Sequence, residues 1–504
     1  MSISFSRFPA TWRLPLVWIE VDPSQAGRPT QRQPAIVFGQ KFTGGTAAAD
    51  VPVAVASLAD AKAFFGEGSM IERMAAAFFA QNNAALLYFL PQAEPSGGTA
   101  ATGSIAISSA PTGPGILTVY IAGQRIQVGL VGTETTAQVA TALAAAIAAM
   151  TTLPVTGVAS TSTVNLTCRW KGSTGNDITI VPNYGGSLAG EAYPAGLALT
   201  ITAMASGAGA PDLTASIAAL GDDIYDYCAF PYTDSVSLGV IATEYGFGDT
   251  GRWGWMRQLY GTVFSARRDT YANQMTWGAT GNDPVTSVLD VEPGAPTPVW
   301  EVAAAYCGQA ARALLNDPAR PLQTLEFEGV LPAPRGARRS KTQANNLAST
   351  GVAVQQVSPN GKMMILTEAS RYQKNVYGQG DDAYFVITTL HTLAAVFRRL
   401  TSSITNKYPR HKLANDGTRL GPGQAIVTSS TVKGELIAEY RDMEYDGLVE
   451  NANAFKAALI VERDANNPNR LNTLFPPDLI NALRVFAVLA QFRLQYSTTD
   501  QAAA

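Results

Sequence analysis

Charged side chains are scarce in this sequence, and neither sign of charge prevails. Of the 504 residues, 15% are Asp, Glu, Lys or Arg and 46% are hydrophobic, whereas a typical globular protein has about 25% charged residues. The 36 basic and 39 acidic residues give a formal net charge of -3. A chain disordered by charge repulsion is therefore excluded, and a dedicated nucleic-acid-binding protein is disfavoured because no positive excess attracts phosphates.

The low charge density predicts a protein that assembles. At roughly 100–200 residues per domain, a chain of this length is expected to fold as about three or four domains. Its surface is neither strongly hydrated nor self-repelling, and such surface is often covered by other subunits.

Cysteine and histidine are also rare. The three cysteines, Cys168, Cys228 and Cys307, are an odd number without a CxxC pair, which disfavours a disulfide framework and a thiolate metal site. We predict that they are reduced core residues. Of the two histidines, His391 lies in an apolar helical pattern and is expected in the core, whereas His411 lies in a basic loop.

Long apolar runs are missing. No 18 consecutive apolar residues occur, and the first 15 residues lack the basic and apolar regions of a signal peptide. We therefore expect no membrane-spanning segment, and a protein that stays in the cytoplasm-like compartment where it is made.

Two short motifs would fit an enzyme. Gly246–Gly251 matches GxGxxG and Asp269 follows it near the position of a ribose-binding acid, but the residues after it, 252–255, are a poor helix start, and the fingerprint requires a strand before it and a helix after it. Ser430–Lys433 matches SxxK without its companion motifs. A nucleotide-dependent oxidoreductase is kept as an alternative, with a glycine turn as the favoured interpretation.

The hydrophobic pattern predicts an interrupted α/β chain. A buried strand at 34–39, helices at 57–65 and 69–81 and a strand at 85–90 follow βαβ order. From 93 to 205 the sequence is rich in Thr, Ala and Gly, and we predict an inserted, mostly β domain. Its expected elements are a helix at 135–150 and strands at 104–108, 116–121, 125–131, 163–169, 177–181 and 197–203.

After the insertion the α/β alternation resumes, so the two flanking halves are expected to form one domain. The further predicted elements are helices at 212–221, 297–316 and 386–408, strands at 227–231, 352–357 and 363–368, and a more polar final α+β segment. The insertion also suits a β-rich surface protein or adhesin, which we keep as a second alternative although no signal sequence supports it.

Two charged patches are candidate contacts between subunits. Arg335, Arg338, Arg339 and Lys341 form a basic loop, and an acidic run includes Asp442 and Glu444. Patches of opposite sign fix the register between neighbours in an assembly. The alternative is that both are ordinary solvated faces.

Both ends of the chain carry apolar residues in strand-like alternation. They are Ile3, Phe5, Leu14, Leu16 and Trp18 near the N-terminus and Phe486, Val488, Phe492, Leu494 and Tyr496 near the C-terminus. Unpaired strand edges of this kind template pairing with another chain. Two alternatives remain open, namely that both ends pair within their own sheet and that 483–496 forms a helix, because Leu483, Ala487 and Ala490 also fit a helical period.

Several long strings in the sequence resemble the tail sheath proteins of Mu-like contractile-tailed bacteriophages. The clearest are 406–418, NKYPRHKLANDGT, 460–470, IVERDANNPNR, and 476–494, which begins PPDLINALRVF. Shorter similar strings are RLPL at 13–16, EVDPSQ at 20–25, KGSTGND at 171–177, DPARPLQT at 317–324 and EGVLP at 328–332.

The resemblance implies an α/β (α+β) multidomain tail-sheath fold that stacks as hexameric rings around a tail tube. Arms from neighbouring subunits would complete the sheet of a third subunit's C-terminal domain. The implied divisions are 1–25, an N-terminal strand arm; 26–92, the first part of the sheath α/β domain; 93–207, an inserted, protruding β-rich domain; 208–345, the second part of the α/β domain; 346–483, a C-terminal α+β domain; and 484–504, a C-terminal strand arm and tail.

The resemblance also implies where the protein acts and with what. It implies a structural virion protein, assembled in the host bacterial cytoplasm, whose contraction drives the tube through the host envelope for genome ejection. The partners it implies are other copies of the chain, the tail tube protein, and baseplate and tail terminator proteins. We expect no catalytic, cofactor-binding or metal-binding residues and no direct contact with nucleic acid or membrane.

Overall fold

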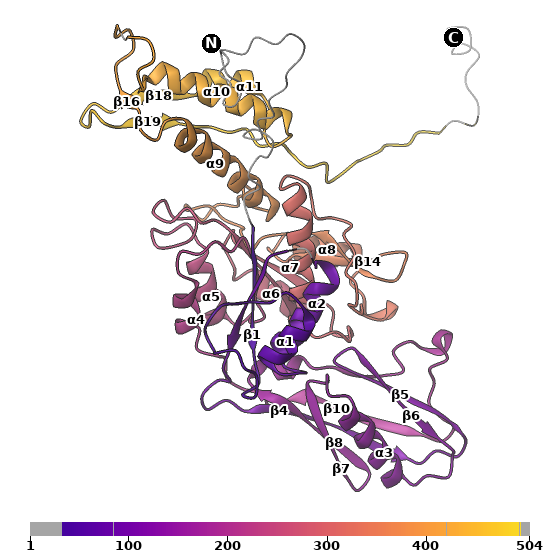
Figure 1. The fold of residues 1–504 in the computed structure, drawn as a ribbon. Helices are drawn as coiled ribbons and strands as arrows, with labels where there is room; N and C mark the ends of the chain where they lie inside the picture. The colour runs from indigo at the N-terminus through magenta and orange to yellow at the C-terminus, as the bar shows by residue number, and fades with distance from the viewer. Residues whose placement is uncertain (1–32, 84, 420, 493, 495–504) are drawn as a thin grey trace, which may run out of the picture.

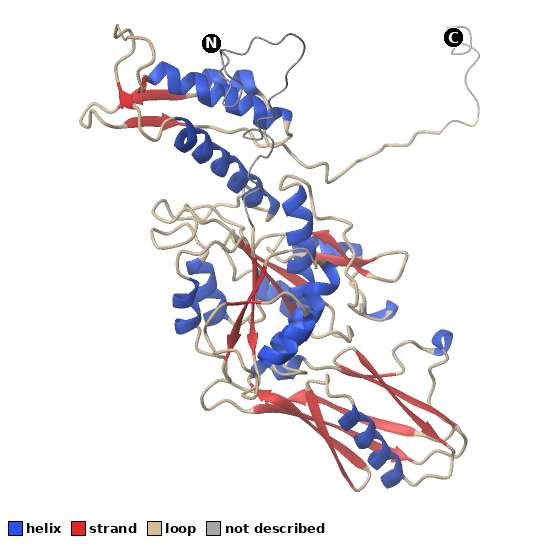
Figure 2. Cartoon of the chain, viewed as in Figure 1, coloured by secondary structure: helices blue, strands red, loops and turns tan. Residues whose placement is uncertain are grey.

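The computed structural model describes residues 33–83, 85–419, 421–492 and 494, and it shows three regions in a row (Figure 1). A central region built on a six-stranded sheet lies between an inserted region, residues 100–205, and a C-terminal region that runs from the second half of helix α9 to Ile480. Helices and sheets occur in all three (Figure 2). The predicted α/β (α+β) multidomain class is confirmed.

The central sheet has the strand order β13-β12-β11-β1-β3-β2. Strand β1 (Ala35–Gln40) pairs in parallel with β3 (Leu87–Gln92) on one side and with β11 (Tyr227–Ala229) on the other, so strands from both sides of the insertion share one sheet. The remaining elements are β2 (Val53–Ala54), α1 (Leu58–Phe65), α2 (Met70–Gln81), α4 (Thr214–Leu220), α5 (Ser235–Glu244), β12 (Thr262–Arg268), α6 (Tyr271–Gly278), β13 (Thr286–Val291) and α7 (Val299–Asn316).

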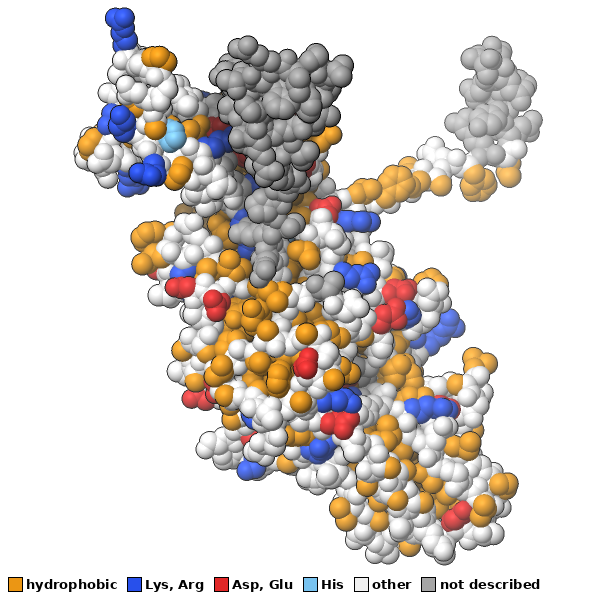
Figure 3. Space-filling model, viewed as in Figure 1, with side chains coloured by type: hydrophobic (Ala, Val, Ile, Leu, Met, Phe, Trp, Pro, Cys, Tyr) orange, Lys and Arg blue, Asp and Glu red, His pale blue; other side chains and the backbone are white. Residues whose placement is uncertain are grey.

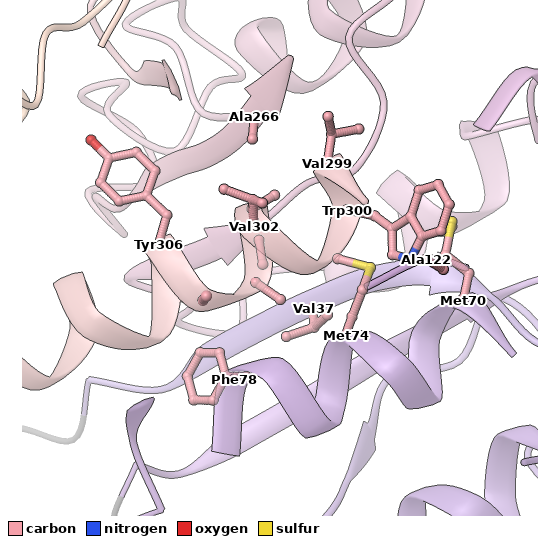
Figure 4. Packing of buried hydrophobic residues seen from close by; sticks show 14 of the residues in the cluster. Val37, Met70, Met74, Phe78, Ala122, Ala266, Val299, Trp300, Val302 and Tyr306 are labelled. Carbon is pink, nitrogen blue, oxygen red and sulfur yellow. The ribbon is translucent and has the colours of Figure 1, made fainter. Parts of the chain in front are cut away.

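Helices α2 and α7 lie side by side against this sheet (Figure 4). Helix α2 begins where the Ser69 side chain accepts a hydrogen bond from the Glu72 N–H, the usual signal of a helix start. Its Met70, Met74 and Phe78 recur every four residues and are fully buried. All six residues of β1 are buried as well, as expected for a parallel sheet covered on both faces.

The inserted region contains two antiparallel sheets and one helix. Their elements are β4 (Ala100–Ser109), β5 (Gly115–Ile121), β6 (Gln124–Leu130), α3 (Thr136–Ala149), β7 (Val155–Ser160), β8 (Thr163–Lys171), two 3₁₀ turns at Ser173–Asp177 and Ser187–Ala189, β9 (Ile180–Pro182) and β10 (Ala198–Ala205). The sheets have the orders β10-β4-β8-β7 and β6-β5-β9.

Two details of the insertion differ from the prediction. The strand predicted at 177–181 is wrong at its start, because the chain forms a 3₁₀ turn through Asp177 and β9 begins only at Ile180. Strand β7 was not predicted, since Gly157 interrupts its apolar alternation. A Cβ at Gly157 would lie 3.1 Å from the side chain of Ile147, so the close packing of α3 on β7 explains the glycine.

Arg73 of α2 holds the insertion against the central region. Its guanidinium donates hydrogen bonds to the carbonyls of Ala122, at 2.8 Å, and Thr152, at 3.0 Å, and it pairs with Glu301 of α7 at 2.5 Å. Because the two carbonyls belong to the inserted region, a single buried cation connects it to both α2 and α7.

Residues 335–367 also pack on the central region. They form a 3₁₀ turn (Arg335–Ala337), α8 (Lys341–Ala348), β14 (Val354–Val357) and β15 (Met363–Thr367). Ala353 bridges Leu289 of β13, and Met363 and Ile365 belong to the main core. These two strands thus contact the central core, although they fall inside the range 346–483 that was predicted for the C-terminal domain. The predicted domain boundaries stay predictions.

Helix α9 (Thr388–Lys407) connects the central and C-terminal regions. Leu390 and Ala394 lie in the main core, whereas Val396 belongs to a second hydrophobic cluster. The other C-terminal elements are β16 (Lys412–Leu413), β17 (Ile426–Val427), α10 (Ser429–Tyr445), α11 (Ala452–Ala458), β18 (Ile460–Arg463) and β19 (Leu471–Leu474). Among the helices of the described residues, none has the length and apolarity needed to cross a membrane.

Candidate functional site

The C-terminal arm, residues 484–504, leaves the molecule as an extended segment over its described part, 484–492 and 494 (Figure 1). It forms neither the alternative helix nor a strand ladder there. The exposed fractions are 81% for Phe486, 68% for Val488, 86% for Phe492 and 95% for Leu494, and Figure 3 shows hydrophobic side chains along its length. Tyr496 lies outside the described residues.

Such a segment is unfavourable in an isolated subunit. Burying one large apolar side chain contributes roughly 1.5–3 kcal/mol, and the arm gains little of this against its own subunit. Residues 485–492 of the arm belong to no helix or strand, so their backbone donors and acceptors could pair with another chain, as in strand addition to an open sheet edge. The arm thus has the chemistry of a donor strand.

The hairpin β18–β19 forms a small sheet in the C-terminal region. Its two strands pair from Ile460 opposite Leu474 to Arg463 opposite Leu471, and within the described residues the sheet has only these two strands. One face packs on the second hydrophobic cluster through Val461 and Leu471. Two-stranded sheets are marginal alone, so further strands at either edge would stabilise this hairpin.

The root of the arm is held by backbone and side-chain bonds. The Glu450 N–H donates to the Asp478 carbonyl at 2.9 Å, and the Ile480 N–H donates to the Leu448 carbonyl at 3.2 Å. Arg484, the first arm residue, pairs with buried Glu368 at 2.5 Å. These bonds therefore hold the chain as far as residue 484, and residues 485–492 after it are exposed.

The predicted N-terminal arm residues lie outside the described residues. Ile3, Phe5, Leu14, Leu16 and Trp18 belong to the segment 1–32. Their part in contacts between subunits stays a prediction.

The residues of the predicted basic loop differ in how strongly they are bonded within the subunit. Arg339 pairs with nearly buried Asp290 through two hydrogen bonds of 2.9 and 3.0 Å, so its charge is already used inside the subunit. Arg338 donates to the Ala333 carbonyl at 2.9 Å, and Lys341 donates to Gln356. Arg335 is exposed.

The predicted acidic run lies at the end of α10. Asp442 and Glu444 are exposed, and Glu444 accepts a hydrogen bond from the Ala452 N–H at 2.9 Å, at the start of α11. No structural contact brings this run to the basic loop within the described subunit. Their proposed pairing would therefore be between subunits.

The glycine motif is a tight turn without the geometry of a nucleotide site. It follows helix α5 rather than a strand, and turns rather than a helix come after it. Its backbone is used internally, since the Gly251 N–H donates to the Gly248 carbonyl and the Trp253 N–H donates to the Gly246 carbonyl. A Cβ at Gly251 would lie 2.2 Å from the Gly246 oxygen, so close packing explains this glycine.

The cysteines and His391 are core residues as predicted. Cys168, Cys228 and Cys307 are free and buried, and burial raises the pKa of Cys168 to about 12. The ring of His391 stacks on Tyr227, and its Nε2 lies 2.7 Å from the Thr262 hydroxyl. Burial, with the positive charge of Arg398, lowers the pKa of His391 to about 3.

Arg484 and Glu368 are two residues of the arm root that the sequence pattern did not indicate. The available signal was the one charge between Leu483 and Gln491 in an otherwise apolar run. Its partner lies 116 positions away, and local pattern does not reveal contacts at that distance. Within the described residues, no group of three or more His, Cys, Asp or Glu side chains is placed to hold a metal ion.

Comparisons with known proteins agree on one family. Residues 206–369 match the family "Phage tail sheath protein central domain", and residues 379–493 match the "Phage tail sheath C-terminal domain". A Mu-like prophage FluMu tail sheath protein from Haemophilus influenzae is 39% identical over 496 residues, which cover 98% of this chain and 100% of that protein.

Two similar solved structures are sheath tail proteins of bacteria. The one from Desulfitobacterium hafniense has a TM-score of 0.48 and 12% identity, covering 93% of this chain and 97% of that chain. The one from Listeria innocua has a TM-score of 0.47 and 10% identity, covering 91% and 94%.

The family assignment rests on the sequence comparisons, which support neither the oxidoreductase nor the surface-protein alternative. The chain belongs to the phage tail sheath protein family and is a structural component of a contractile phage tail.

Proposed function

We propose that this subunit polymerises as hexameric rings around a tail tube, and that contraction of the stacked rings drives the tube through the host envelope for genome ejection. The observation that carries the proposal is the C-terminal arm, whose large apolar residues are 68–95% exposed from Val485 to Leu494. An isolated subunit leaves these apolar side chains in water, whereas a polymer would bury them.

The arm joins neighbouring subunits by adding a strand to the hairpin β18–β19. Phe486, Val488 and Phe492 alternate at period two and would share one face of the added strand. That face continues the apolar face of the hairpin, where Val461 and Leu471 cover the second cluster. The N-terminal arm, with Ile3 and Phe5 among its apolar residues, would fill another open edge.

Donated strands suit a sheath that must shorten without coming apart. Main-chain ladder bonds depend little on side-chain geometry, so they persist while side-chain contacts between subunits switch from one arrangement to another by rigid-body rotation. A gain of about 1–3 kcal/mol per subunit, the size typical of coupled transitions, would sum over many rings to a large driving force.

The remaining partners follow from the same role. The subunit would contact the tail tube protein along its inner surface and baseplate and tail terminator proteins at the ends of the sheath, after assembly in the host bacterial cytoplasm. Arg335, Arg338 and Lys341 on one subunit would face Asp442 and Glu444 on the next, because exposed patches of opposite charge set register.

Truncation tests the donated arm directly. Ending the chain after Arg484 removes 485–504 but keeps the root of the arm, and we expect a folded, soluble subunit that forms no tubes by negative-stain electron microscopy. Normal tubes from this truncation would refute strand donation by the C-terminal arm.

A matched pair of variants separates backbone pairing from loss of apolar area. Val488→Ala keeps the N–H and Val488→Pro removes it. If the arm pairs as a strand through this N–H, proline blocks tube formation more strongly than alanine; Leu489→Pro tests the opposite edge of the same strand, since successive N–H groups point to opposite sides.

A further inference from the structure

One buried ion pair fixes the point at which the C-terminal arm leaves the subunit. Glu368 follows β15, and its side chain has no exposed surface. Arg484 places two guanidinium nitrogens on this carboxylate, at 2.5 and 3.2 Å. A two-point contact of this kind fixes direction as well as distance.

Neighbouring groups complete the contact. Glu368 Oε1 also accepts a hydrogen bond from the Leu322 N–H at 3.3 Å, and Arg484 donates to the Thr388 hydroxyl at 3.3 Å. One residue earlier, the Leu483 carbonyl accepts from the Gln323 side chain at 3.2 Å. The pair thus connects the arm to the loop after α7 and to the first turn of α9, both of which pack on the central core.

The residues before Arg484 are bonded to the subunit, whereas those after it are exposed. Before it, Asp478 and Ile480 are hydrogen-bonded to 448–450 in the C-terminal region. After it, Val485, Phe486 and Leu489 are 81–86% exposed. Leaving Glu368 without its cation would strand a buried charge, which is strongly unfavourable.

We propose that the Arg484–Glu368 pair is the fixed end of the donated arm: it positions the arm and sets Val485 as the first residue free to pair with a neighbour. This inference rests on the proposed strand donation. With the pair intact, the tether between subunits begins at the central region. Without it, the tether lengthens toward Ile480, and a longer flexible tether lowers the effective concentration of the arm at its partner.

The first test is trypsin cleavage after Arg484 in the unassembled full-length chain, followed by mass spectrometry. Trypsin must take the arginine side chain into its specificity pocket, so the paired Arg484 is protected. We expect Glu368→Gln to speed this cleavage about tenfold, because proteolysis follows the population of the open form. Glu450→Gln is the matched control: Glu450 also faces the arm root, through Asn481 at 3.5 Å, and its change should leave the rate within about twofold of wild type.

The second test is the critical concentration for tube formation, measured by sedimentation for the same variants. We expect Glu368→Gln to raise it about fivefold and Glu450→Gln to leave it unchanged. Faster cleavage without a change in assembly, or a change in assembly without faster cleavage, would overturn the positioning role. So would a null result in both.

A second variant protects the test against misfolding of Glu368→Gln. Arg484→Gln changes the partly exposed partner, and hydrogen exchange of the Ile480 amide replaces the trypsin readout. Faster exchange together with weaker assembly supports the pair, and any other combination contradicts it. Failure of strand donation itself would appear separately, as normal tubes from the chain that ends at Arg484.

Discussion

The central and C-terminal regions bury their β-sheets to different extents. In the central sheet, β1 and β13 are buried at every position, and helices α2 and α7 pack against it. In the C-terminal region, β18 and β19 have no fully buried residue. The first region buries its sheet within one subunit, whereas the second has an exposed hairpin and an exposed apolar arm, which we propose bind other copies.

A buried ion pair nevertheless stabilises the contact between the central and C-terminal regions. Arg398 of α9 forms an ion pair with Asp226, which is 2% exposed, next to the start of β11. Burial raises the pKa of Asp226, and the charge of Arg398 and its hydrogen bond oppose that rise. Because α9 also packs in both hydrophobic clusters, the open edges are attached to the central region by a continuous helix.

The largest expected effect comes from one substitution made in both regions. Phe78→Ala empties a fully buried site in α2 and should lower the free energy of unfolding of the subunit by about 3–5 kcal/mol. Phe486→Ala removes the same side chain where it is 81% exposed and should change subunit stability by less than about 0.5 kcal/mol. Chemical denaturation of the unassembled chain measures both.

Assembly should show the opposite order. Phe486→Ala is expected to weaken tube formation although its subunit is stable, because the proposed strand donation would bury this side chain in the polymer. If Phe486→Ala destabilised the isolated subunit as much as Phe78→Ala, the arm would have to fold back on its own chain, and the contrast between the two regions would fail.

The next effect is a pH dependence that belongs to the central region. His391 is buried beside Tyr227 with a pKa lowered to about 3, so the folded chain keeps it neutral while the unfolded chain protonates it below pH 6.5. The unfolded state then binds more protons, and stability falls as the pH drops. Between pH 6.5 and 4.5 the loss from this group is about 2–3 kcal/mol.

The variant His391→Gln isolates this contribution. It retains a side chain that can bond Thr262 but does not titrate, so its unfolding free energy should vary less with pH than that of the wild type over the same window. Denaturation at several pH values measures the difference. An equal slope in both proteins would show that His391 does not carry the effect.

The sequence predicted the elements whose buried face is specified by the local spacing of apolar residues. The apolar run of β1 and the four-residue spacing in α2 and α9 state which face is buried, and these elements form close to the predicted bounds. The glycine motif was also interpreted correctly as a turn, because the residues after it do not start a helix.

The features that the sequence pattern could not predict depend on contacts between residues that are far apart along the chain. Arg484 is 116 positions from its partner Glu368, and Arg339 is 49 positions from its partner Asp290. The charge pattern therefore did not indicate that Arg484 holds the root of the arm or that Arg339 forms an ion pair within the subunit. Helix α10 was missed as a separate element because its exposed face is polar and its buried residues are few.

The smallest expected effect tests how the arm root is held in the C-terminal region. Tyr440 of α10 is buried; its hydroxyl donates to the Glu450 carbonyl at 2.7 Å and accepts from the Asp478 N–H at 3.0 Å. Tyr440→Phe keeps the ring stacked on Phe455 and removes both bonds, at a cost of about 1–2 kcal/mol. Hydrogen exchange should become faster at Asp478 and Ile480 while the amides of β1 are unchanged. Faster exchange in β1 as well would mean that the two regions unfold as one unit. If the C-terminal region unfolds separately, the lost stability affects only the amides of that region.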